Sequence, residues 1–339
     1  MRAIVYEENG PAEVLQLVDR PARTPGPGEV RVRIHVSAVN PTDWKSRQGS
    51  TAGTRLDEPQ VPNQDGAGVI DAVGPGVTDH EPGDRVWLWD AAYQRTDGTA
   101  QELVVIPDHQ VVPLPDEASF ELGASLGIPA LTAHRALTAS ESGPDLLYPG
   151  ALDSHTVLVT GGAGAVGHFA IQLAVWAGAT VITTVSSPEK AELARRAGAH
   201  HVLDYRRDDV DARLAELAPE GIDTVVEVNA TANIDTDVRA LAQGGTIAIY
   251  TSDEHSHLAV PVRASMVKNA RIQFVLTYTT TPEQKHNAVE AVSAAVEDGA
   301  LSVGDGSGLP IIRYPLENTA DAHRAVEQNA VGKVIIELG

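Results

Sequence analysis

The stretch TVLVTGGAGAVG, residues 156–167, decides the fold of this chain. A short apolar run at 156–160 precedes a glycine-rich turn, and apolar residues at helical spacing follow over 166–177. A strand that enters a helix through the spacing Gly-x-Gly-x-x-Gly is typical of a dinucleotide-binding turn. Gly162 is expected to permit the tight turn, Gly164 to let the backbone approach a pyrophosphate, and Gly167 to let helix and strand pack closely.

The helix N-terminus after this turn offers free N–H groups and the positive end of a dipole to phosphate. The alternative is a glycine-rich turn without a ligand, which the strand–turn–helix context disfavours. The residues expected to contact the cofactor phosphates are Gly161, Gly162, Ala163, Gly164, Ala165, Val166 and Gly167.

The segments after the turn alternate between strand and helix, which predicts an α/β fold with a doubly wound parallel sheet. Expected strands are 180–185, 201–203, 224–228 and 246–250, expected helices are 188–197, 209–218 and 235–242, and 271–276 is a candidate edge strand. Helices are also expected over 120–137 and 282–297.

The first third of the chain has a different pattern, with short segments rich in Val and Ile between turn clusters. It predicts an antiparallel, barrel-like unit with strands at 3–6, 30–39, 68–73, 85–88, 103–106 and 110–114. The tail returns to a mixed pattern, with strands at 311–314 and 332–338 around a helix at 320–328.

Composition narrows the possible classes of protein. The 339 residues suit about two domains. The absence of Cys excludes disulfides, thiolate nucleophiles and Cys-ligated zinc, and the net charge of -21 argues against nucleic acid. No apolar run approaches the roughly 20 residues of a membrane helix, and a cytoplasmic location is expected. Many carboxylates with only five lysines suit a protein of a high-salt cytoplasm, or reflect a GC-rich genome.

The end of the second expected strand favours NADPH over NADH. An NAD site would place an acid there to bond the ribose 2′-hydroxyl, but Ser186 and Ser187 follow, and then Lys190. These groups suit a 2′-phosphate, and Tyr205 and Arg206 after the next strand are expected to add contacts. Lys190 is alternatively a solvated helix residue. The scarce basic residues are expected to concentrate at this site.

Further motifs lie along the whole chain, and they include VNPTD at 39–43, GAGVI at 66–70, PGDRV at 82–86, GIPALTA at 127–133 and GKV at 332–334. With these motifs, the chain resembles the zinc-independent medium-chain dehydrogenase/reductases, and within them the quinone oxidoreductases related to zeta-crystallin. The resemblance implies a GroES-like catalytic domain over 1–123 and 278–339, and a Rossmann NADP-binding domain over 124–277.

The resemblance also bears on the metal. Zinc-dependent relatives place Cys where Asn40 stands and a His-Glu pair where Gln64 and Asp65 stand. A catalytic zinc site needs three protein ligands, so we expect no metal. The donor to the substrate oxygen is then expected from protein side chains.

Three residues are candidates for the catalytic site. Asn40 is expected beside the nicotinamide, or alternatively pins its loop. Lys45, where relatives often carry Tyr, is a candidate proton or hydrogen-bond donor, or alternatively a solvated residue. Asp43 is expected to orient neighbours, by pairing with Lys45 or by capping a short helix. Trp44 either lines the pocket or packs in the core.

Further cofactor contacts follow from the resemblance and from strand ends. Thr132 matches a cofactor-contacting Thr of the family. Asn229, Tyr250 and Thr251 follow expected strands, at the edge where open α/β sheets bind ligands. Lys333 matches a basic position on the cofactor side, or alternatively pairs with a surface acid.

The leading hypothesis is an NADPH-dependent oxidoreductase that reduces quinones or α,β-unsaturated carbonyls, as a homodimer or homotetramer without membrane or nucleic-acid partners. The alternatives are an enoyl thioester reductase, a crystallin-like structural or RNA-binding protein, and a metal-dependent alcohol dehydrogenase. The physiological substrate is not written in the sequence.

Overall fold

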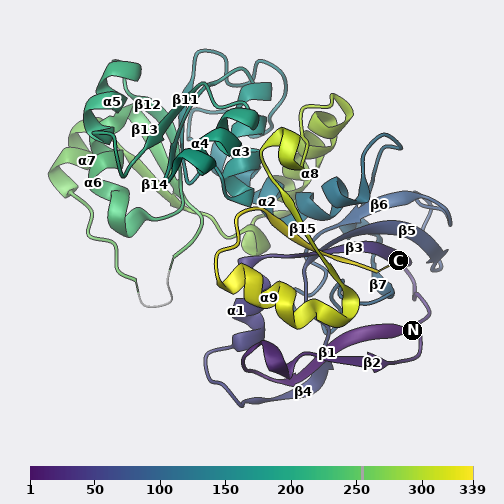
Figure 1. Cartoon of the computed structure of the whole chain (residues 1–339). Helices are drawn as coiled ribbons and strands as arrows, with labels where there is room; N and C mark the ends of the chain where they lie inside the picture. The colour runs from purple at the N-terminus through teal and green to yellow at the C-terminus, as the bar shows by residue number, and fades with distance from the viewer. Residues whose placement is uncertain (253–255, 339) are drawn as a thin grey trace. The chain divides into compact units, whose positions relative to one another are not determined.

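The computed structural model describes residues 1–252 and 256–338, and the chain forms two compact units (Figure 1). Unit 1 comprises Met1–Ile128 and Pro310–Gly339, and unit 2 comprises Pro129–Leu309. The second boundary differs from the expected one at residue 278. Residues 278–309 group with unit 2 because helix α3 (Ala165–Trp176) is bonded to this segment: His168 Nε2 lies 2.8 Å from the Ser302 carbonyl oxygen, and Trp176 Nε1 donates to Asp298 at 2.9 Å.

Unit 2 contains a parallel six-stranded sheet in the order β11-β10-β9-β12-β13-β14. The strands are β9 (Thr156–Thr160), β10 (Thr180–Val185), β11 (His201–Asp204), β12 (Ile222–Glu227), β13 (Leu241–Ile249) and β14 (Arg271–Phe274). From β9, the chain adds β10 and β11 on one side of the sheet, and it then returns to add β12, β13 and β14 on the other side. The reversal lies between β9 and β12, which is where dinucleotides bind in doubly wound sheets.

The helices of unit 2 follow from this order. Besides α3 they are α4 (Pro188–Arg196), α5 (Val210–Leu217), α6 (Ala230–Ala240), α7 (Val262–Lys268) and α8 (Pro282–Glu297). Right-handed crossovers on opposite sides of β9 place α3 and α4 on one face of the sheet and α5 and α6 on the other. The strands β9, β10 and β12 between these layers are almost wholly buried, as expected for a parallel sheet covered on both faces.

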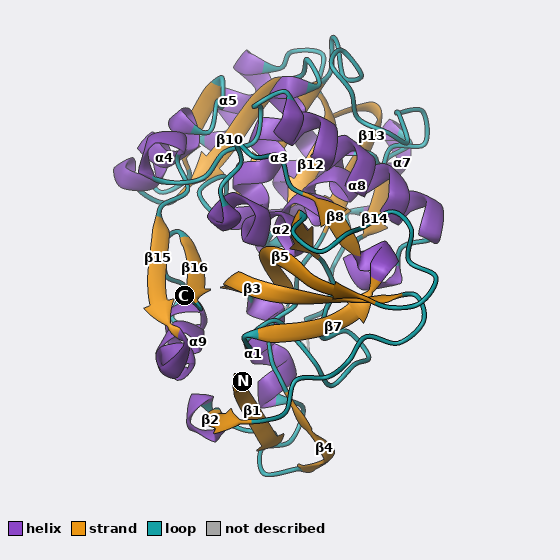
Figure 2. Cartoon of the chain, turned by 90° about the vertical axis from the view of Figure 1, so that its right-hand side faces the viewer, coloured by secondary structure: helices purple, strands orange, loops and turns teal. Residues whose placement is uncertain are grey.

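Unit 1 is built on a largely antiparallel seven-stranded sheet in which β3 (Glu29–Val39) pairs with β5, β7 and β16 (Figure 2). Its other strands are β5 (Asp65–Val73), β6 (Arg85–Leu88), β7 (Leu103–Pro107), β8 (Val111–Pro113), β15 (Ile311–Pro315) and β16 (Lys333–Glu337). A small sheet adds β1 (Arg2–Glu8), β2 (Gln16–Asp19) and β4 (Arg55–Gln60). The unit also holds α1 (Pro41–Gln48) and α9 (Thr319–Glu327), and α2 (Phe120–Leu137) begins in it.

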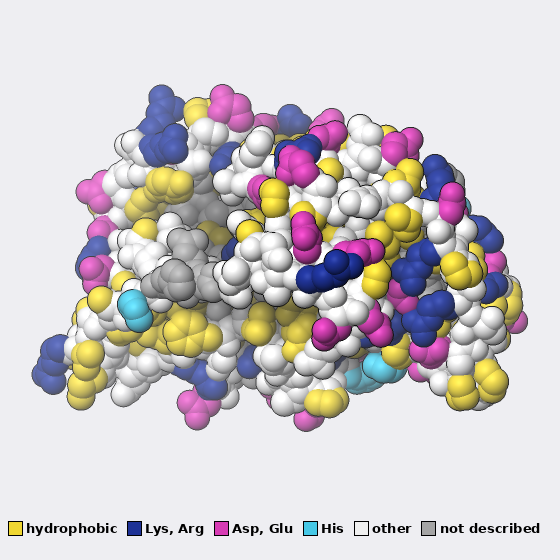
Figure 3. Space-filling model, turned by 90° about the horizontal axis from the view of Figure 1, so that it is seen from below, with side chains coloured by type: hydrophobic (Ala, Val, Ile, Leu, Met, Phe, Trp, Pro, Cys, Tyr) yellow, Lys and Arg dark blue, Asp and Glu magenta, His cyan; other side chains and the backbone are white. Residues whose placement is uncertain are grey.

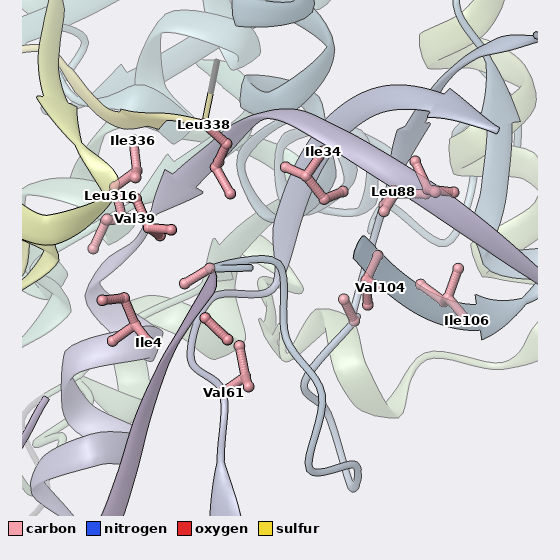
Figure 4. Packing of buried hydrophobic residues seen from close by; sticks show 14 of the residues in the cluster. Ile4, Ile34, Val39, Val61, Leu88, Val104, Ile106, Leu316, Ile336 and Leu338 are labelled. Atoms are coloured by element: carbon pink, nitrogen blue, oxygen red, sulfur yellow. The ribbon is translucent and has the colours of Figure 1, made fainter. Parts of the chain in front are cut away.

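The core of unit 1 joins both ends of the chain. Apolar side chains from the first strands, among them Ile4 and Ile34, pack in one cluster with Leu316, Ile336 and Leu338 from the last thirty residues (Figure 4). The expected GroES-like domain is confirmed, and unit 1 contains residues from both ends of the chain.

The predicted elements are largely those observed. Two exposed, polar strands, β2 and β4, were not predicted, because neither carries an alternating apolar face. Helix α6 begins at Ala230, five residues before the predicted start, and β14 is the edge strand that was expected. In the part of the chain that the structure describes, no helix is long and apolar enough to cross a membrane.

Candidate functional site

The glycine turn joins β9 to α3 in a tightly packed form. The residue with a positive φ, +70°, is Gly161 and not Gly162, so the tight turn depends on Gly161. Gly162 is needed for a different reason: a Cβ there would lie 2.1 Å from Thr183 Oγ1 in β10. A Cβ on Gly167 would lie 2.5 Å from the Gly161 carbonyl oxygen, so Gly167 lets the first turn of α3 pack closely against the glycine turn.

The start of α3 is open to a ligand. Gly164 is the N-cap residue, and a Cβ there would meet only the Gly161 carbonyl oxygen, at 3.4 Å. The first backbone N–H groups of an α-helix have no acceptor within the helix, so those of Ala165, Val166 and Gly167 remain for a ligand. The turn therefore fits a pyrophosphate by both its space and its donors.

The ends of β10 and β11 bring the second group of cofactor candidates together. Ser187 caps α4 by accepting the backbone N–H of Lys190 at 3.3 Å, and Ser186 is half-buried beside it. The backbone N–H of Tyr205 donates to the Val185 carbonyl at 3.0 Å, which places Tyr205 and the exposed Arg206 next to the end of β10.

The expectation that the basic residues concentrate at this edge of the sheet is wrong. Most arginines pair with carboxylates throughout both units, for example Arg31 with Asp71 at 2.5 Å and Arg239 with Asp211 at 2.7 Å. Figure 3 shows basic and acidic side chains interspersed over one face. Within the described ranges, by contrast, neither Lys190 nor Arg206 forms an ion pair, so both remain available to an anion.

Three further residues that are expected to contact the cofactor lie after β12 and β13. Asn229 is the exposed N-cap residue of α6, while Tyr250 and Thr251 are half-buried after β13. Sequence reasoning missed Glu227, the last residue of β12, which is fully buried. Its carboxylate accepts the backbone N–H of Asn229 and, at 3.1 Å, the side-chain N–H of Asn233. The available signal was a single acid in the apolar run TVVEV at 224–228.

In unit 1, Asn40 and Asp43 organise the start of α1. The Asp43 carboxylate accepts the backbone N–H of Asn40 at 2.6 Å and that of Gln64 at 3.1 Å. Asn40 is the N-cap residue of α1 and Asp43 is its third helical residue, so the bond from the Asn40 N–H to Asp43 is one half of a capping box. The capping role expected for Asp43 is thus present. The expected alternative, a pair with Lys45, is absent because Asp43 is buried and Lys45 is exposed.

The Asn40 side chain is held at both ends. Its Nδ2 donates to Asp65 at 2.8 Å, and its Oδ1 accepts from the Lys333 ammonium at 2.6 Å. All three residues are almost completely buried. Lys333 therefore contacts an internal amide, and the alternative of a surface acid as its partner is wrong.

The electrostatics of this cluster follow from burial. Burial and the neighbouring Asp65 carboxyl raise the pKa of Asp43 to about 8. Burial raises the pKa of Asp65 to about 6, although the Lys333 ammonium opposes this rise. Burial lowers the pKa of the Lys333 ammonium against the effect of both carboxylates. We call Asn40, Asp43, Asp65 and Lys333 the ammonium cluster.

The GIPALTA motif of α2 packs against Asp65 of the ammonium cluster. Asp65 accepts the backbone N–H of Ile128 in α2 at 2.9 Å, and a Cβ on Gly127 would lie 2.1 Å from its Oδ1. Gly127 is therefore required for the carboxylate to reach the helix backbone. The GIPALTA motif thus serves a packing function at its first residue, and Thr132, further along α2, is also buried.

The other expected catalytic side chain, Lys45, lies at the surface of α1. Its ammonium is 5.8 Å from the centroid of the half-buried Trp44 ring. The burial on which a proton-donor role depended is absent.

Known proteins resemble the whole chain. Residues 26–116 match the family model of the alcohol dehydrogenase GroES-like domain, and residues 165–294 match that of zinc-binding dehydrogenase. A quinone oxidoreductase of Lama guanicoe is 33% identical over 342 residues, covering 100% of this chain and 98% of that protein.

Two solved structures are similar over the full length of both chains, each with 30% identity. One is a mycobacterial protein complexed with NADPH, with a TM-score of 0.81, and the other is a protein described as an NAD-dependent alcohol dehydrogenase, with a TM-score of 0.85. The two-unit fold with its dinucleotide turn defines a medium-chain dehydrogenase/reductase. Within that class, the chain belongs to the quinone oxidoreductase family.

Proposed function

We propose that this protein is an NADPH-dependent reductase of quinones and α,β-unsaturated carbonyls that works without zinc. The observation that carries the cofactor choice is the end of β10, where no acid is present and where Lys190 and Arg206 have no ion-pair partner among the described residues. The NADPH bound to the mycobacterial relative and the quinone activity in the name of the guanaco relative support the same choice.

The residues at the zinc position do not fit zinc. The Asn40 oxygen is occupied by the Lys333 ammonium, and the Asp65 carboxylate is occupied by the side chain of Asn40 and the backbone of Ile128. A cationic group already balances the carboxylates where a metal would have to bind. Three free protein donors, which a catalytic zinc needs, are not present in this cluster.

In this proposal, residues of the chain bind NADPH and orient the reacting groups. The turn at 161–167 holds the pyrophosphate on backbone N–H groups, and Ser187, Lys190 and Arg206 hold the 2′-phosphate. Bound NADPH supplies the hydride, and a proton from water completes the hydroquinone. We assign Asn40 the role of a positioning residue, because its side-chain oxygen and one of its side-chain N–H groups are already bonded inside the ammonium cluster.

Quinones and enones suit this arrangement chemically. Reduction of a simple ketone places full charge on one oxygen and gains most from a metal ion or a dedicated donor. In a quinone or an enone, conjugation spreads the developing charge, so less electrophilic assistance is required.

The proposal includes assembly and location. A second copy of the chain is proposed to cover the exposed apolar side chains next to the edge strand β14, which are Val262, Met266, Val267, Phe274 and Leu276. The dimer or tetramer is proposed to act in the cytoplasm at high salt, where its acidic surface is screened.

The function is tested by NADPH and NADH oxidation with naphthoquinone, an alkenal, a crotonyl thioester and a simple ketone. We expect NADPH to be preferred and the quinone to be reduced fastest. In Lys190→Ala the KM for NADPH should rise about tenfold while the KM for NADH is unchanged, since the lost bond is made only to the 2′-phosphate. Activity on the ketone alone, or a preference for NADH, would contradict the proposal.

A further inference from the structure

A second pair of buried acids lies in unit 2, outside the ammonium cluster. Glu227 at the end of β12 and Asp237 in α6 are 0% and 1% exposed. Besides burial, Glu227 is the acid that raises the pKa of Asp237, so the two carboxyl groups are close to each other. Neither carboxyl forms an ion pair with a Lys, Arg or His in the part of the chain that the structure describes.

The two carboxyls differ in their other partners. Glu227 accepts N–H groups from Asn229 and Asn233. Its chain neighbours Val226 and Val228 are bonded to the hydroxyl of Thr160, the residue before the glycine turn. Neither carboxyl oxygen of Asp237 has a hydrogen-bond donor among the described residues, and the acid that acts on its pKa is Glu227. Two ionised carboxylates in contact, buried and without a cation, are strongly unfavourable. One of them must hold a proton.

The hydrogen-bond donors around each carboxyl group indicate which of the two acids, Glu227 or Asp237, holds the proton. Glu227 has several donors that stabilise a carboxylate, whereas Asp237 has none. Burial and the charge of Glu227 raise the pKa of Asp237 to about 9. At neutral pH, Asp237 is therefore a neutral acid whose O–H donates to the Glu227 carboxylate.

The groups around the pair do not supply another charge. From α7, the Lys268 ammonium is bonded to the carbonyl oxygens of Arg239 and Leu241. From α5, Asp211 pairs with Arg239. Tyr250, after β13, is close enough for Glu227 to raise its pKa, but burial makes the larger contribution and keeps it neutral.

We propose that Asp237, as a neutral acid, is a positioning residue for cofactor binding. Its shared proton holds the Glu227 carboxylate in place, and Glu227 in turn fixes Asn229 at the start of α6. The backbone on either side of Glu227 holds Thr160 before the glycine turn. Loss of that proton in alkaline solution puts two negative charges beneath the phosphate-binding edge and weakens NADPH binding. This inference rests on the proposed use of NADPH.

The test compares the full-length wild type with Asp237→Asn, Asp237→Ala and the control Asp235→Asn. The amide introduced by Asp237→Asn keeps an N–H donor to Glu227 and cannot ionise, whereas Asp235 is exposed on the same helix. NADPH dissociation constants are measured by fluorescence from pH 7 to pH 10. We expect the wild type and Asp235→Asn to weaken about tenfold above pH 9 and Asp237→Asn to weaken less than about threefold. Asp237→Ala should be about tenfold weaker already at pH 7.

A second readout needs no cofactor. Because the pKa of Asp237 is higher in the folded state, its contribution to stability is complete below the unfolded pKa of about 3.9 and is lost as pH rises toward 9. The urea midpoint of the wild type should therefore fall relative to that of Asp237→Asn between pH 6 and 9, and Asp235→Asn should follow the wild type.

The same alkaline weakening in Asp237→Asn as in the wild type would overturn the proposal, as would a difference in urea midpoint that does not change with pH. A wild type that binds no NADPH at any pH overturns the proposed function and the cofactor link together. The urea series then still decides whether Asp237 holds a proton.

Discussion

The two units each bury a pair of carboxyl groups but neutralise them differently. In unit 1, the Lys333 ammonium is bonded to Asn40, 293 positions away in sequence, and its charge acts on both Asp43 and Asp65. In unit 2, neither Glu227 nor Asp237 has an ion-pair partner among the described residues, and we infer that they share a proton. Only the ammonium cluster contains a cation, so removal of that cation should affect unit 1 alone, whereas a rise in pH should affect the acid with the raised pKa in each unit, Asp43 and Asp237.

Removing the cation from unit 1 should have the largest effect. Lys333→Met leaves a buried carboxylate without its partner, and we expect the free energy of unfolding to fall by about 3–5 kcal/mol. Urea denaturation measures this loss, with Lys45→Met as the control, because the exposed Lys45 should change stability by less than about 0.5 kcal/mol. Equal effects of the two substitutions would show that the ammonium is not a structural charge.

Neutralising one acid in each unit should separate the two sites directly. Asp65→Asn leaves the Lys333 ammonium underpaired and should cost about 2–4 kcal/mol of stability at pH 7. Asp237→Asn replaces an acid that is already neutral and should cost less than about 1 kcal/mol. Similar losses in both variants, measured by the same urea titration, would remove the distinction between the sites.

The pH dependence of stability sharpens the comparison within unit 1. Burial raises the pKa of Asp43 to about 8, above its unfolded value, so the folded state takes up a proton. The stability that this group contributes is complete below about pH 4 and is lost as pH rises through 8. Compared with Asp43→Asn, the wild type should lose about 2–4 kcal/mol between pH 5 and 8. A constant difference across that range would place a permanently ionised carboxylate at this position.

The smallest effect is expected at Lys45. Its ammonium is exposed and faces the Trp44 ring, so Lys45→Ala should change kcat/KM for naphthoquinone by less than about twofold. A loss of tenfold or more, with stability unchanged, would restore Lys45 as a catalytic residue.

The sequence was most informative where structure is local. The predicted bounds of β9, β10, α2 and α8 are those observed, because buried strands and long amphipathic helices carry a strong apolar pattern. The glycine turn was located correctly, although the left-handed residue is Gly161, and only the backbone geometry shows this.

The contacts that define both acid pairs were beyond sequence reasoning. Lys333 was expected near the cofactor or at a surface acid, and its bond to Asn40 joins residues 293 positions apart. Glu227 interrupts the apolar run at 224–228, but nothing in a single sequence shows that Asp237 is buried close to it.

The most direct test of the proposed function and of the ammonium cluster is NADPH oxidation with naphthoquinone before and after exhaustive treatment with a chelator, followed by addition of Zn²⁺. The Lys333 ammonium is bonded to the Asn40 oxygen, and we propose that it takes the place of a metal ion, so we expect turnover to be unchanged by the chelator and not increased by Zn²⁺. Turnover that is lost on chelation and restored by Zn²⁺ would contradict the account.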